Sequence, residues 1–160
     1  MSQSGVPQPG PSGGAAVPSS GPDAAVARVV LRAYQAWWAA QVQAFATGDQ
    51  TGAQVRAYSN GQALSQVLVS LQQLHQAQLV MTGAPATDPV VRQLDLRSSP
   101  QSAVIEDCVD VTGWHQADAH SGAIEDPPQR LTRYPATVVL RINDSSWKVF
   151  EFNREAGRTC

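Results

Sequence analysis

The sequence has few charged residues and no excess of either sign. Of its 160 residues 15% are charged, with 11 lysines and arginines against 13 aspartates and glutamates, so the net charge is −2. The chain therefore lacks the basic field that holds nucleic acid or anionic lipid, and we expect no nucleic-acid partner. With 42% apolar residues, the composition also excludes a wholly disordered chain and predicts a domain with a core.

Long hydrophobic runs and catalytic motifs are also missing. No stretch of about 18 apolar residues occurs, so we expect no membrane-spanning segment. The opening MSQSGVPQPG lacks the basic and apolar regions of a signal peptide. No GxSxG, GxxxxGK[ST], strand-linked GxGxxG or HExxH pattern is found, and the three histidines and two cysteines follow no ligand spacing. We therefore expect no cofactor and no metal site.

The composition of the chain changes at about residue 22. Fifteen of the first 22 residues are Gly, Pro or Ser, and such a segment buries too little apolar surface to offset its ordering entropy. The sequence predicts a disordered tail over 1–22 and one folded domain over 23–160.

Helical spacing dominates the first half of the domain. Apolar residues recur at this spacing over 24–47, after Asp23 as a candidate N-cap and before Gly48. This helix is apolar over more than half of its circumference, so it must be covered on two sides or line a cavity. A short helix over 52–58 and an amphipathic helix over about 59–76 are expected next.

Beyond residue 78 the pattern alternates with a period of two, which is typical of strands. We expect a polar loop over 113–129, with strand character left open at its edges. In the last strand the alternation places Phe150 and Phe152 on one face. Helices followed by a meander of strands predict an α+β fold with a segregated helical layer. The expected strands cover residues 78–82, 89–98, 102–112, 130–142 and 147–154.

Asp107 is the carboxylate of greatest interest. Alternation puts it on the same face as Ala103, Ile105, Val109 and Val111. Burial among these side chains would raise its pKa, as a general base for proton abstraction requires. The alternative is a structural aspartate that accepts a hydrogen bond from a backbone N–H or pairs with an arginine.

The two cysteines, Cys108 and Cys160, are too far apart for a CxxC motif. A disulfide between them would close a loop of about 53 residues and stabilise the fold by roughly 4 kcal/mol. Two unrelated thiols in a cytosolic protein are the alternative. An exposed terminal cysteine left free would be a liability outside the cell, so pairing fits an oxidising compartment better.

Three segments of this chain resemble a group of small secreted proteins and lipoproteins of actinobacteria, mostly of unknown function and similar in build to the NTF2-like superfamily. They are VIEDCVDVTGW (104–114), ATVVLRINDSSWKVFEF (136–152) and GRTC (157–160). The resemblance spans 23–160. It implies a long first helix across a strongly curved antiparallel sheet that forms a cone, and an extracytoplasmic location, secreted or tethered to a membrane.

The resemblance also implies a pocket between the first helix and the concave sheet face. Tyr34, Trp38 and Asp107 are the residues expected to contact a ligand there. The favoured function is a non-catalytic domain that binds a small apolar ligand or a protein partner, with homodimer formation left open. One alternative is a scaffold subunit of an envelope or secretion assembly. Another is an enzyme of the SnoaL or ketosteroid-isomerase type, with Asp107 as base and Tyr34 as hydrogen-bond donor.

Overall fold

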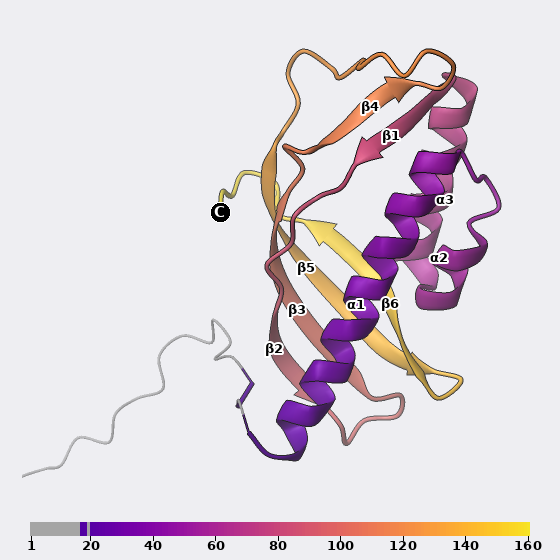
Figure 1. Cartoon of the computed structure of the whole chain (residues 1–160). Helices are drawn as coiled ribbons and strands as arrows, with labels where there is room; N and C mark the ends of the chain where they lie inside the picture. The colour runs from indigo at the N-terminus through magenta and orange to yellow at the C-terminus, as the bar shows by residue number, and fades with distance from the viewer. Residues whose placement is uncertain (1–16, 19) are drawn as a thin grey trace, which may run out of the picture.

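The computed structural model describes residues 17, 18 and 20–160, which form helices first and then strands (Figure 1). The predicted tail over 1–22 lies mostly outside the described residues. Three of its described members belong to the fold, because the Val17 N–H donates to the Val91 carbonyl oxygen at 3.3 Å, Gly21 is the N-cap of the first helix and Pro22 begins that helix. The elements are α1 (Pro22–Thr47), α2 (Ala53–Tyr58), α3 (Gly61–Gln76), β1 (Leu79–Gly83), β2 (Val90–Asp95), β3 (Ser102–Asp110), β4 (Trp114–Asp118), β5 (Arg133–Asn143) and β6 (Ser146–Arg154).

The strands form two antiparallel sheets, one of order β2-β3-β5-β6 and one of β1 paired with β4. The predicted α+β class with antiparallel strands is confirmed. The strand character left open at the edges of the expected loop over 113–129 is found at its start, where β4 pairs with β1 from Leu79 to Gly83. That pairing joins segments about 35 residues apart in the chain, so no local turn signal marks it.

Helix α1 lies across one face of the four-stranded sheet (Figure 1). It contacts β2 and β6 of this sheet, and it also contacts β1 and both shorter helices. The expectation that α1 is covered on two sides is therefore confirmed. Its fully buried residues Val30, Tyr34 and Trp37 join Ile105 and Leu140 of the sheet in one core. No helix in the described part of the chain is both long and apolar enough to cross a membrane.

The start of α1 differs from the prediction. Gly21, not Asp23, is the N-cap, and no side chain caps the helix. Pro22 occupies the first helical position, where its fixed φ suits a helix and its missing N–H costs nothing. Asp23 falls in the first turn, where its charge complements the helix dipole.

At the start of α3 the Asn60 side chain accepts a hydrogen bond from the Gly61 N–H at 2.8 Å.

The last strand carries a bulge. The pairing of β5 with β6 shifts register between Val139 and Leu140. One extra residue in a strand reverses the alternation beyond it, so Phe152 is buried while Phe150 is only half-buried. Phe150 lies under the Arg141 guanidinium, 5.3 Å from its ring centroid. The prediction that both phenylalanines share one face is wrong for this reason.

The predicted disulfide forms between Cys108 of β3 and Cys160, whose Cα atoms are 5.8 Å apart. Cys108 alternates with the buried Asp107 and Val109, so it points away from α1. The bond therefore ties the end of the chain to the outer face of the sheet.

Candidate functional site

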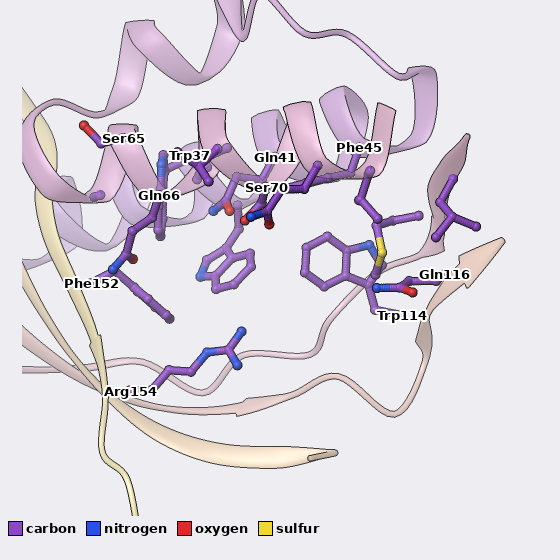
Figure 2. A pocket seen from close by; sticks show the side chains of 18 of the residues that line it. Trp37, Gln41, Phe45, Ser65, Gln66, Ser70, Trp114, Gln116, Phe152 and Arg154 are labelled. Carbon is purple, nitrogen blue, oxygen red and sulfur yellow. The ribbon is translucent and has the colours of Figure 1, made fainter. Parts of the chain in front are cut away.

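A cavity of about 1060 Å³ lies under the second half of α1 (Figure 2). Its walls come from α1, α3, the β1–β4 pair and the ends of β5 and β6. A space of this size accommodates a ligand as large as a lipid or a drug-sized molecule. Six aromatic side chains line it: Trp37, Trp38, Phe45, Trp114, Tyr134 and Phe152.

Helical spacing explains the α1 wall. Trp37, Gln41 and Phe45 follow each other at intervals of four, which places them along one side of the helix. Trp38, one position on, points about 100° away from Trp37. It closes the wall by edge-on contacts, with its ring centroid 6.0 Å from that of Trp114 and 5.7 Å from that of Phe152. On its other side Trp38 lines a second, smaller hollow of about 490 Å³ against residues 84–87.

Helix α3 supplies the polar wall of the cavity. Ser65, Gln66, Ser70 and Gln73 line it alongside the buried Val67. The glutamine-rich face of this amphipathic helix was visible in the sequence, but the pattern alone did not tell which feature of the fold it would face.

Arg154, at the end of β6, is the one charged residue among the described residues that line the cavity. In Figure 2 its guanidinium reaches from the strand toward the helices above it. The guanidinium carbon lies 4.4 Å from the ring centroid of Tyr134, a cation–π contact that holds the group in place. Burial raises the pKa of the Tyr134 hydroxyl, and the neighbouring charge of Arg154 acts against this rise. Within the described structure Arg154 forms no ion pair.

Several side-chain N–H groups in the wall are buried without a hydrogen-bond partner among the residues that the structure describes. Leaving a buried donor unsatisfied costs about 1–3 kcal/mol. The Trp38 N–H lies toward the Tyr34 hydroxyl and lowers the pKa of that group, without reaching hydrogen-bond geometry. The groups are the indole nitrogens of Trp37, Trp38 and Trp114 and the amide nitrogen of Gln41.

Asp107 and Tyr34, both predicted to contact a ligand, instead bind each other in the core. The Tyr34 hydroxyl donates to Asp107 Oδ2 at 2.6 Å, and the backbone N–H of Asp88 donates to Oδ1 at 2.6 Å. Burial raises the pKa of Asp107, and these two hydrogen bonds oppose the rise. Burial and the adjacent carboxylate raise the pKa of Tyr34.

Of the three residues expected to contact a ligand, only Trp38 is among those that line the cavity. Tyr34 is wholly buried and Asp107 is 4% exposed. Asp107 accepts a hydrogen bond from a backbone N–H. This is the contact expected for the alternative, a structural aspartate. Sequence reasoning did not identify Arg154, Trp114 or Phe152 as lining residues, because their strands meet α1 only in the folded chain.

His115 of β4 belongs to a structural cluster with Asp126 and Arg130. His115 Nδ1 lies 2.5 Å from Asp126 Oδ2, and this contact lowers the pKa of Asp126. Arg130 donates to the Val111 and Trp114 carbonyl oxygens at 2.9 Å each, which fixes the strand that carries the Trp114 side chain. In the described part of the chain no three histidine, cysteine or acidic residues are grouped to hold a metal ion.

Comparison with known proteins yields a likeness of fold alone. No family model matches the chain, and no curated protein matches it. Among solved structures it is similar to the crystal structure of the intermembrane space region of chloroplast protein ARC6, with a TM-score of 0.50 and 15% sequence identity. The match covers 82% of this chain and 97% of that chain. At this identity the likeness concerns the arrangement of helices and strands and carries no function.

Proposed function

We propose that this chain is a non-catalytic, extracytoplasmic domain that binds a small apolar ligand in the cavity under α1. One observation carries the proposal: six aromatic side chains surround a space of about 1060 Å³. Trp114 is half-buried and the other five expose at most 8% of their surface. A ligand that covers the apolar surface still open to solvent in the cavity gains the free energy of burial.

The enzyme alternative has less support. A general base must reach the proton of a bound substrate, but both Asp107 oxygens accept hydrogen bonds within the core. Tyr34, the suggested donor to an enolate, gives its hydroxyl proton to Asp107. The protein-partner and scaffold alternatives remain predictions, which a pull-down with residues 1–22 present and deleted would test.

The proposed build and location have separate supports. A long first helix that lies across an antiparallel sheet is the arrangement expected of an NTF2-like cone (Figure 1). The bond between Cys108 and Cys160 favours an oxidising compartment, because cytosolic thiols are kept reduced. The intact mass of the protein isolated from its native host, before and after reduction and alkylation, tests the bond and reveals any processing or attached lipid.

The binding test uses the neutral fluorescent probe N-phenyl-1-naphthylamine. Gln66 and Ser70 line the cavity from α3, so the double variant Gln66→Trp/Ser70→Trp fills part of the cavity with two indole rings. Gln72 and Gln76 have the same spacing on the exposed side of this helix, so Gln72→Trp/Gln76→Trp is the matched control. We expect the wild type and the control to bind the probe and the filled variant to bind it at least tenfold more weakly. Equal binding by all three would refute the cavity as the site.

A further inference from the structure

We propose that the ligand of this cavity is an amphipathic carboxylic acid, with its carboxylate on Arg154 and its hydrocarbon body between the aromatic walls. This inference rests on the proposed function and specifies the class of ligand. Three features of the cavity support this ligand class: its charge, the geometry of the guanidinium and the polarity of the inner wall.

The charge of the cavity is positive. Arg154 is the one charged group among its described lining residues, and it has no carboxylate partner in the described structure. Glu155, the nearest acid in sequence, accepts a hydrogen bond from the Thr137 hydroxyl at 2.7 Å and does not line the cavity. An anionic ligand would therefore meet one cation and no like charge.

The guanidinium is placed for a head group at the mouth. Arg154 is exposed while Phe152, two residues before it on the strand, is buried. A ligand head on Arg154 thus stays partly solvated, and its body passes inward over Phe152. The planar fork of a guanidinium matches the two oxygens of a carboxylate. A single cation suits a monoanion, whereas phosphate dianions are usually held by several cations or backbone N–H groups.

The inner wall favours hydrogen-bond acceptors over donors. Trp37, Gln41 and Trp114 each bury a side-chain N–H that has no partner in the described part of the chain. Neighbouring atoms cover these nitrogens, so the tryptophan or glutamine side chain must rotate before its N–H can donate to a ligand oxygen. A pure hydrocarbon offers them nothing, but an oxygen-bearing molecule that accepts from them offsets their unsatisfied state.

The test compares decanoate with 1-decanol, which share one chain length and differ in charge. Each displaces N-phenyl-1-naphthylamine from the wild type, from Arg154→Gln and from Arg141→Gln at pH 8. Arg141 is the matched control because it also lies over an aromatic ring, that of Phe150, but does not line the cavity. We expect Arg154→Gln to weaken decanoate about five- to tenfold and to leave decanol within twofold. The control should leave both ligands unchanged.

Two results would overturn the inference and they differ in meaning. If Arg154→Gln binds the probe and decanoate as the wild type does, the carboxylate does not use Arg154, and the proposed function stands without this ligand class. If the wild type binds neither the probe nor decanoate, the proposed function fails together with the inference. The variant Arg154→Lys adds a check, since a retained charge without the fork should recover only part of the lost affinity.

Discussion

Removal of a single hydroxyl tests the buried pair that fixes α1 to the sheet. In Tyr34→Phe the ring and its packing remain, and only the 2.6 Å hydrogen bond to Asp107 Oδ2 is lost. Because both residues are buried, water cannot replace the donor without a change in the core. A hydrogen bond to a charged group contributes about 1.5–3 kcal/mol, so we expect a loss of about 2 kcal/mol at neutral pH. For about 140 folded residues, that loss lowers the melting temperature by about 7 °C.

The effect of Tyr34→Phe should depend on pH. Burial raises the folded-state pKa of Asp107 above its ordinary value, so the folded protein holds this proton more tightly than the unfolded chain. The stability from this group is fully present below the unfolded pKa and is lost as pH rises through the folded pKa. The Tyr34 hydrogen bond favours the ionised form, so its removal raises the folded pKa of Asp107 further. The difference between wild type and variant should therefore be largest at neutral pH and shrink as pH falls and the carboxyl protonates.

Urea unfolding followed by circular dichroism, at intervals from pH 3 to 8 with the disulfide intact, measures this difference. Tyr58→Phe is the control, because Tyr58 is a half-buried tyrosine at the end of α2 and should change stability by less than about 0.5 kcal/mol. In an Asp107→Asn background the pH dependence of the Tyr34→Phe effect should vanish. A loss below 0.5 kcal/mol at pH 7, or a difference that grows toward low pH, would refute the argument.

Three further changes should alter stability. Replacing both Cys108 and Cys160 with alanine should cost about 2–5 kcal/mol in urea unfolding, and equal stability before and after reduction of the wild type would contradict this. Gly83→Ala places a Cβ 2.1 Å from a backbone carbonyl oxygen just before β4. At Gly122 φ is also positive, but nothing lies within 4 Å of an added Cβ. The Gly83→Ala variant should therefore melt at a temperature well below that of the Gly122→Ala variant. Asn60→Ala removes the cap of α3 and should cost about 1 kcal/mol, whereas an unchanged unfolding midpoint would show that the cap contributes nothing.

Local sequence patterns predicted most of the fold. Periods of 3.6 and of two are properties of neighbouring residues, so α1, α3 and the long strands were predictable. The alternation around Asp107 also placed it correctly on the buried face with Val109. The bulge at Phe150 was not predictable, because the alternation of the sequence does not show where the β5–β6 hairpin shifts register. The pairing of β1 with β4 was not predictable either, because it joins segments about 35 residues apart. A single extra residue is enough to reverse a face.

The site was less predictable than the fold, for the same reason. The stripe of Trp37, Gln41 and Phe45 belongs to one helix, and its spacing was available in the sequence. Arg154 ends a strand more than a hundred residues later, and no local signal distinguishes it from the other arginines. Charge and aromatic content were visible in the sequence, but their meeting in one cavity required the topology.

The two halves of α1 have different partners, and this separates anchoring from binding. Tyr34 is anchored to Asp107 on the four-stranded sheet. Beyond Trp37 the helix runs over β1 and Trp114 of β4 and beside the polar wall of α3, where serines and glutamines leave space that a core of branched apolar residues would fill. The same helix therefore carries the hydrogen-bonded clamp of Tyr34 and Asp107 in its first half and covers the cavity with its second half. Tyr34→Phe should then lower stability while probe affinity stays within twofold, and a variant that lost both together would show that the clamp shapes the cavity.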